Sequence, residues 1–259
     1  MPITQKLLLS FSPIWLGVLI VGASVLMSVA GLVIVRRYIS HKVLKGHNDI
    51  AGAIFNTLGV AYAVLLAFVA VVAWQNFDRS SQNVESEANC LINIARDSSA
   101  FGKEFHEQAM TLAMEYSNSV VKDEWPLLAS GEGSSRTREA FEKLFSLYTV
   151  YMPQNKREEI FLSESIKNLN MLGELRRTRI FDSKQGIHPI LWMILLAGAA
   201  VTVVFTFFFG SDNHQAQILM TSLLATLIAL IIYTILMLDF PFTGSVSIEP
   251  TAFRQMYKY

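Results

Sequence analysis

The stretch that decides the fold is GAIFNTLGVAYAVLLAFVAVVAW, which runs from Gly52 to Trp74. Its 23 residues carry no charge, and a helix of this length crosses about 30 Å of hydrocarbon. Small or polar residues recur within it every three or four positions, so they share one face of the helix. These residues are Gly52, Asn56, Gly59, Ala63, Ala67 and Ala70.

Two interpretations fit this small-residue stripe. Small residues let membrane helices approach closely, and Asn56 can bond across such a contact, so the stripe is typical of helix packing. If several copies of the chain surround one axis instead, the same stripe lines a pore. The stripe by itself leaves both interpretations open.

The composition indicates a membrane protein. Apolar residues make up 52% of the chain and charged residues 16%, below the roughly 25% charged residues of soluble domains. Positive and negative residues balance at 21 each, and no dense basic run is present, which argues against nucleic acid as a partner. The single Cys90 excludes an intramolecular disulfide and a cysteine metal cluster.

The charges are concentrated in one block, because 31 of the 42 charged residues lie between Gln75 and Pro189. Apolar stretches long enough to cross a membrane lie on both sides of this block, and no useful strand-like alternation occurs within it. We therefore expect an all-α membrane protein with four transmembrane helices and a long helical soluble block between the second and third. The expected segments are a first transmembrane helix with its polar connection (1–50), a second transmembrane helix that is the candidate pore helix (51–74), a helical soluble domain (75–188), the third and fourth transmembrane helices (189–238) and a C-terminal tail (239–259).

Motifs for catalysis or cofactor binding are not found. The chain has no Gly-rich phosphate loop, no G-x-S-x-G and no H-E-x-x-H, and its histidines match no standard metal spacing. We expect no enzyme activity, no cofactor and no metal. The pairs Glu158-Glu159 and Arg176-Arg177 are expected on solvated helix faces. With Arg179 and Lys184, the two arginines form a basic cluster that could attract anionic lipid or free anions.

Three short motifs carry a family resemblance. The run LGVAYAVLLAF (58–68), with Asn76, Asp78-Arg79, Glu85 and the NIAR segment (93–96), resembles the second helix of bacterial bestrophins. HNDIAG (47–52) and DFPFTG (239–244) resemble more closely the four-helix bestrophin-like membrane proteins.

The resemblance implies a homo-oligomeric ion channel, a pentamer that conducts anions passively through a central pore lined by the second transmembrane helix. It places the chain across the bilayer of a bacterial inner (plasma) membrane, with the helical domain and both termini in the cytoplasm. Hydropathy alone leaves the orientation open. Four cations lie in the first connection, and eight lie on the opposite side, which agrees with a cytoplasmic helical domain. The four are Arg36, Arg37, Lys42 and Lys45; the eight are Lys6, Arg79, Arg176, Arg177, Arg179, Lys184, Arg254 and Lys258.

The resemblance also implies a pore constriction at the positions that match Gly52, Asn56 and Val60, with Gly59, Ala63 and Ala67 completing the lining. Only Val60 keeps the apolar character that the family has there. Rings of Gly and Asn would leave a wider and wetter constriction, or the Asn56 amide would contact an anion.

After the last transmembrane helix, Asp239, Pro241, Phe242 and Gly244 match the segment that couples this helix to gating. The acidic calcium-binding run of animal bestrophins is missing after Gly244, so calcium gating is not expected. The alternative function is a non-conducting membrane scaffold or signalling protein whose helical domain binds a partner.

Overall fold

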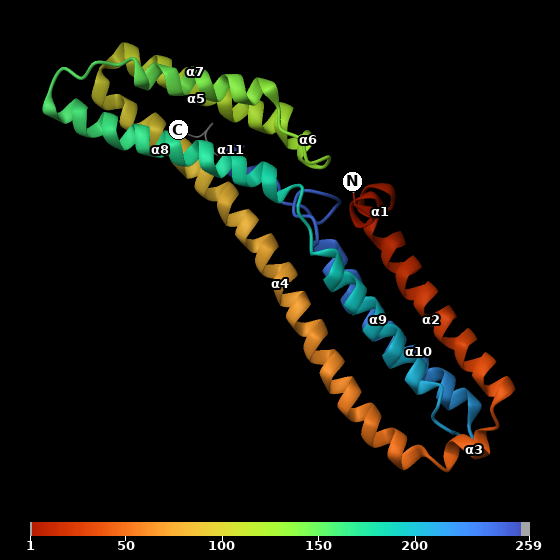
Figure 1. Ribbon diagram of the computed structural model, residues 1–259. Coiled ribbons are helices and arrows are strands. Elements are labelled where there is room, and N and C mark those ends of the chain that lie inside the picture. Colours follow the sequence, from red (N-terminus) through yellow and green to blue (C-terminus); the bar gives the residue numbers. More distant parts are fainter. Residues whose placement is uncertain (1, 255–259) are drawn as a thin grey trace. The chain divides into compact units, whose positions relative to one another are not determined.

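The computed structural model describes residues 2–254, apart from the side chains of residues 3, 41 and 42. Every regular element in this range is helical, which confirms the predicted all-α class (Figure 1). The described residues form two compact units. The membrane unit comprises residues 2–75 and 187–239, and the helical unit comprises residues 76–186 and 240–254.

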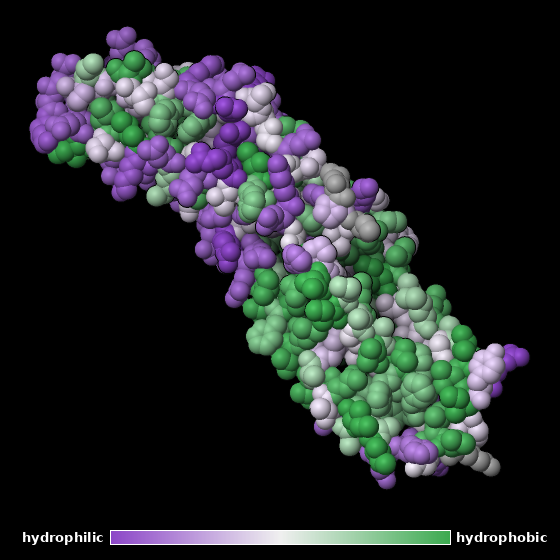
Figure 2. All heavy atoms as spheres, viewed as in Figure 1, coloured by the Kyte–Doolittle hydropathy of each residue, from purple (hydrophilic) through white to green (hydrophobic). Residues whose placement is uncertain are grey.

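The membrane unit holds the four helices that are long and apolar enough to cross a bilayer, as the sequence predicts. They are α2 (Pro13–Tyr38), the first part of α4 (Asn48–Asp97), α9 (Pro189–Thr206) and α10 (His214–Leu238). The short helices α1 (Ile3–Ser10) and α3 (His41–Lys45) flank α2. Apolar side chains cover the visible side of α2, α9 and α10 in Figure 2, as expected for helices that face lipid.

The helical unit contains the second part of α4 and a set of helices with shorter, more polar sequences, and hydrophilic side chains gather on its visible surface (Figure 2). These elements are the 3₁₀ turn η1 (Ser98–Phe101), α5 (Lys103–Ser119), the π-helical turn η2 (Val120–Glu124), α6 (Trp125–Leu128), α7 (Ser135–Thr149), α8 (Lys156–Asp182) and α11 (Thr251–Arg254). The two longer helices after α5, namely α7 and α8, each begin with a side-chain N-cap. Ser134 accepts from the Thr137 N–H at the start of α7, and Asn155 accepts from the Glu158 N–H at the start of α8, as N-caps do.

Two local features shape the chain between α4 and α7. Gly102 has a φ of 91°, a conformation that glycine adopts without a Cβ clash, and it ends η1 so that α5 can begin. In η2 the Trp125 N–H bonds to the Val120 carbonyl five residues earlier. Pro126 follows and has no N–H with which to continue the normal four-residue ladder.

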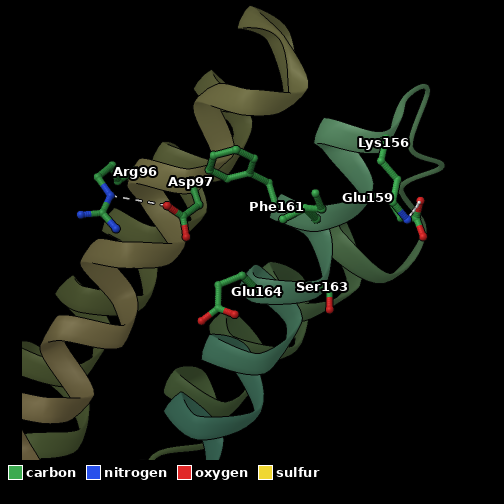
Figure 3. Close-up of a pocket in the computed structure, with 8 residues that line it drawn as sticks. Arg96, Asp97, Lys156, Glu159, Phe161, Ser163 and Glu164 are labelled. Atoms are coloured by element: carbon green, nitrogen blue, oxygen red, sulfur yellow. Dashed lines mark hydrogen bonds and ion pairs between the residues drawn. The ribbon is translucent and has the colours of Figure 1, made fainter.

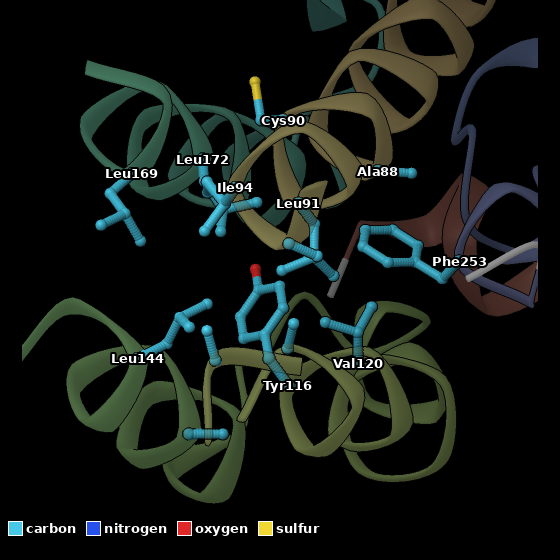
Figure 4. Close-up of a cluster of buried hydrophobic side chains, with 14 of the residues drawn as sticks. Ala88, Cys90, Leu91, Ile94, Tyr116, Val120, Leu144, Leu169, Leu172 and Phe253 are labelled. Atoms are coloured by element: carbon cyan, nitrogen blue, oxygen red, sulfur yellow. The ribbon is translucent and has the colours of Figure 1, made fainter. Parts of the chain in front are cut away.

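The core of the helical unit is built from residues far apart in the sequence (Figure 4). Leu91 and Ile94 of α4 meet Tyr116 of α5, Leu144 of α7 and Leu172 of α8, and all five are fully buried. Residues 240–254, predicted to be part of a C-terminal tail (239–259), also belong to this core. Three of their side chains are buried in it, namely Phe242, Ile248 and Phe253.

Candidate pore helix and the sites around it

One face of α4 packs against α9 inside the membrane unit. The Tyr62 hydroxyl donates to the Leu195 carbonyl oxygen over 2.9 Å. The Tyr62 ring lies so close to Gly198 that a Cβ on this glycine would be 2.4 Å from it. Nearer the start of α4, the rings of Phe55 and Phe209 meet edge to face with centroids 5.6 Å apart. The contact of Tyr62 with Gly198 and that of Phe55 with Phe209 therefore determine which face of α4 packs against the rest of the membrane unit.

The predicted pore-lining residues share a different face of α4, which the described chain leaves open. Asn56, Val60, Ala63 and Ala67 are exposed, whereas Gly52 and Gly59 are half-buried by their own helix. An added Cβ at either glycine would meet no atom within 4 Å. All but Ala67 line one shallow hollow of about 540 Å³, together with the edges of Phe55 and Phe209.

This open face bears directly on the two interpretations of the stripe. Packing against the same chain would bring side chains or backbone within contact distance of Gly52 and Gly59. Within residues 2–254 the structure provides no such contact. Whatever contacts the stripe therefore lies outside the described residues of this chain.

The start of α4 is fixed by the loop between α9 and α10. The Asn48 side chain accepts from the Gly210 N–H over 2.9 Å and donates to the Gly210 carbonyl over 2.8 Å. Arg36 at the end of α2 donates to the Ser211 carbonyl over 2.7 Å, and Lys45 forms an ion pair with Asp212. Asn48 of the HNDIAG motif thus has a structural role, the attachment of the start of α4 to this loop, which the motif alone does not predict.

The four residues proposed for gating fall in two places. Asp239 is the last residue of the membrane unit, whereas Pro241, Phe242 and Gly244 belong to the helical unit. Phe242 packs edge to face on Trp125 with ring centroids 5.7 Å apart. The Pro241 carbonyl accepts from the Ile248 N–H over 2.8 Å, and Gly244 has a φ of 86°. The segment therefore makes a tight turn that seats Phe242 in the helical core.

Asp239 joins the end of α10 to the start of α9. It lies just past the apolar span, is buried, and its Oδ1 accepts from the Ile187 N–H over 2.6 Å. Burial raises the pKa of this carboxyl, and the hydrogen bond from Ile187 opposes the rise. The carboxylate thereby holds the residues that lead into α9.

The helical unit contains a buried ionic cluster, here defined as Glu87, Glu124, Arg176 and Arg179. Arg179 is fully buried and donates to both oxygens of Glu87 over 2.7 and 3.1 Å. It also donates to Glu124 over 2.8 Å. Arg176 binds the same Glu124 through Nε over 3.1 Å and through Nη2. Two arginines are therefore balanced by two carboxylates in the protein interior.

Aromatic residues and hydroxyls complete the surroundings of this ionic cluster. The guanidinium carbon of Arg179 lies 5.2 Å from the ring centroid of Trp125 and 5.9 Å from that of Phe253. The Tyr116 hydroxyl donates to Glu87 over 2.8 Å. Burial by itself lowers the pKa of Arg179, but the two carboxylates outweigh it, and the pKa is raised. Arg179 therefore stays charged: its Nε and Nη2 donate to the carboxylates, whereas its buried Nη1 has no hydrogen-bond partner among the described residues.

The expectation of a solvated basic cluster is wrong for two of its members. Arg179 is fully buried, and the Arg176 side chain is only 11% exposed, while Arg177 and Lys184 are exposed. The reason is visible in the spacing, because positions 176 and 179 continue the buried face of α8 that carries Leu169 and Leu172. Glu87 was missed for the same reason, since it lies on the α4 face of Val84 and Leu91, both buried.

A polar groove lies between the end of α4 and the start of α8 (Figure 3). It has a volume of about 570 Å³, and its charged side chains carry both signs. Arg96 pairs with Asp97 over 3.4 Å, and Lys156 pairs with Glu159 over 2.9 Å. Among the described residues no group of three or more His, Cys, Asp or Glu could hold a metal ion.

Comparison with known proteins gives a consistent result. The chain matches the family model of the bestrophin-like domain over residues 22–253. It is similar to a solved bacterial bestrophin homologue from Klebsiella pneumoniae, with a TM-score of 0.66, 12% identity, and coverage of 91% of this chain and 96% of that chain. Two single-residue variants of such a homologue from the same organism give TM-scores of 0.70 and 0.68. The first is 12% identical and covers 92% of this chain and 99% of that chain; the second is 13% identical and covers 93% and 97%. No curated protein sequence matches the chain.

Proposed function

This chain belongs to the bestrophin-like family, and on that premise we propose that it is an oligomeric membrane channel that conducts ions passively. The observation that carries the proposal is the open face of α4 around Asn56, which no other part of the described chain covers. A closed ring of copies would turn this face toward one shared axis. The family resemblance adds a pentameric ring and anions as the conducted ions.

The constriction is proposed at Gly52, Asn56 and Val60. A ring of Asn56 amides presents N–H donors, and such donors can replace part of the hydration shell of an anion. Val60 supplies the one apolar ring, and with 59% of its surface exposed it is free to face a common axis. Gly59, Ala63 and Ala67 would widen the pore beyond it.

Gating is proposed to involve the segment after α10. Asp239 holds the start of α9 through Ile187, while Pro241, Phe242 and Gly244 form the turn that seats Phe242 in the helical core. A displacement of this turn would change the end of α10. The segment is therefore suited to link the two units, and we assign it that role.

The proposed location is a bacterial inner membrane, with the helical unit and both termini in the cytoplasm. Two membrane helices, α9 and α10, separate residues 76–186 from residues 240–254. An even number of crossings returns the chain to the same side, which agrees with a helical unit built from both segments. We propose that the protein has no enzymatic activity.

The test is the conductance of the purified protein in planar bilayers, compared with Asn56→Leu. A leucine ring excludes water and removes the amide donors. Because the apolar leucine ring narrows and dewets the constriction, we expect the conductance to fall. Thr57→Leu is the matched control, because Thr57 is exposed one position away and its hydroxyl bonds within α4 to Ala53.

Three results decide the matter. Conductance that falls in Asn56→Leu and persists in Thr57→Leu supports a pore lined by this face. Conductance unchanged by Asn56→Leu removes the assignment of the face. A correctly assembled oligomer that passes no current under a salt gradient removes the channel and leaves the scaffold function. The reversal potential under the same gradient tests the preference for anions.

A further inference from the structure

A groove in the membrane unit runs between α2, α9 and α10. Its volume is about 470 Å³, and none of its lining residues belongs to α4. The floor includes Ala225 and Ala229, each only 2% exposed. Gly31, Ala199 and Ala200 form parts of the walls. The alanines leave space between the helices, whereas the Phe207 ring packs so closely on Gly31 that a Cβ there would lie 2.6 Å from it.

The lining is apolar in its chemistry. It contains no charged residue, and the hydroxyl of Ser28 donates to the Ser24 carbonyl of its own helix over 2.6 Å. A polar ligand would lose its hydrogen bonds to water here without replacement, which is unfavourable. The groove therefore suits a hydrocarbon.

The length of the groove limits which molecule can occupy it. The lining extends from Ile20 to Gly31 on α2, and from Leu196 on α9 to Phe207, the residue that follows this helix. At 1.5 Å per residue each wall is about 16 Å long, close to half of a hydrocarbon core of about 30 Å. The groove is thus as long as one leaflet of the bilayer.

The groove is too narrow to enclose a whole helix. The volume of about 470 Å³ spread over this length gives an average cross-section of about 29 Å². A helix about 10 Å across would need roughly 80 Å². A polymethylene chain, whose carbons contact neighbouring atoms at about 4 Å, fits the available section.

We propose that this groove holds one acyl chain of a membrane phospholipid. Apolar burial does not distinguish protein from lipid inside a bilayer. The acyl chain is held instead by dispersion contacts with three helices at once. An acyl chain at the outer surface of the protein touches fewer protein atoms. The site depends on α2, α9 and α10 crossing the membrane and not on ion conduction by α4.

The experiment uses the full-length protein in phosphatidylcholine vesicles that contain a phosphatidylcholine with a photoactivatable diazirine in the middle of one acyl chain. After irradiation, adducts are located to single residues by mass spectrometry. Adducts on Ala225 and Ala229 require a chain inside the groove, because both residues lie on its floor. The test variant is Ala200→Phe, which places a ring in the groove. The matched control is Ala197→Phe, which lies on the same helix, is exposed, and does not line the groove.

We expect floor adducts in the wild type and in Ala197→Phe, and their loss in Ala200→Phe. Should Ala200→Phe not elute as the wild-type oligomer on a sizing column, Ala200→Leu takes its place in the comparison. The proposal is overturned if the wild type shows no floor adducts, or if the adducts persist in the correctly assembled groove variant. Equal loss in Ala197→Phe also overturns it. Absent floor adducts together with a smaller oligomer in both Ala200 variants would identify the groove as a subunit contact instead.

Discussion

Replacing Arg179 by Met tests the ionic cluster of the helical unit most directly. The change keeps a long apolar stem but removes the guanidinium that bonds Glu87 over 2.7 and 3.1 Å and Glu124 over 2.8 Å. Glu124 retains Arg176 and the Ser134 N–H. Glu87 keeps the Tyr116 hydroxyl but loses its buried counter-ion.

The magnitude follows from this imbalance. Breaking a buried ion pair by removing one partner lowers the free energy of unfolding by about 3–5 kcal/mol. For a unit of this size, about 1 kcal/mol shifts the Tm by roughly 4 °C, so we expect the Tm to fall by about 12–20 °C. Arg177→Met is the matched control, since Arg177 is exposed on the same helix and should change stability by no more than about 0.5 kcal/mol.

The assay is thermal unfolding of the purified full-length protein, followed by tryptophan fluorescence; one of the four tryptophans is Trp125, whose ring lies against Arg179. A second variant separates charge from packing. Adding Glu87→Gln to Arg179→Met removes the unpaired charge, so the double variant should regain part of the lost stability. Equal Tm values for Arg179→Met and Arg177→Met, or a double variant less stable than the single one, would refute the reasoning.

Three further predictions address other positions. Gly198→Ala should destabilise the membrane unit by about 1–3 kcal/mol, because the new Cβ would lie 2.4 Å from the Tyr62 ring. Gly22→Ala should not, because the space around its Cβ is open. Thermal unfolding of the two variants compares their stabilities. Cys90, buried at 5% exposure, should react with a maleimide only after denaturation, and rapid labelling of the native protein would contradict the packing. Burial raises the pKa of Asp239 in the folded protein, so stability falls as the pH rises from the ordinary pKa of an aspartate to the raised one. Asp239→Asn should therefore raise the Tm relative to wild type near neutral pH, and this advantage should vanish toward about pH 4; an advantage that does not change with pH would argue against the raised pKa.

Much of the fold could be predicted because it depends on local sequence properties. The uncharged run from Gly52 to Trp74 and the apolar lengths of the other spans require helices in hydrocarbon. The grouping of small residues on one face of α4 also follows from spacing alone. Spacing does not predict what each face of a helix packs against. The contact of Tyr62 with Gly198, for example, joins positions far apart in the chain.

The errors have the same physical origin. Arg176 and Arg179 resemble solvated residues when only charge is considered, yet their carboxylate partners Glu87 and Glu124 lie 52 to 92 positions earlier. A charge can be buried when its partner is buried beside it, and a sequence does not reveal that partner. The spacing of α8 does offer a warning, because both arginines lie on the face of Leu169 and Leu172.

The contribution of residues 240–254 to the helical core has a consequence for biosynthesis. Residues 76–186 emerge from the ribosome before α9 and α10 have been synthesised. At that stage Phe253 is not yet available to cover the guanidinium of Arg179. Domains usually fold as they emerge, but this one lacks Phe242, Ile248 and Phe253 until two more helices have entered the bilayer. Maturation of the helical unit must therefore finish after translation of the last membrane helix, and a nascent chain stalled before residue 240 would carry an open core.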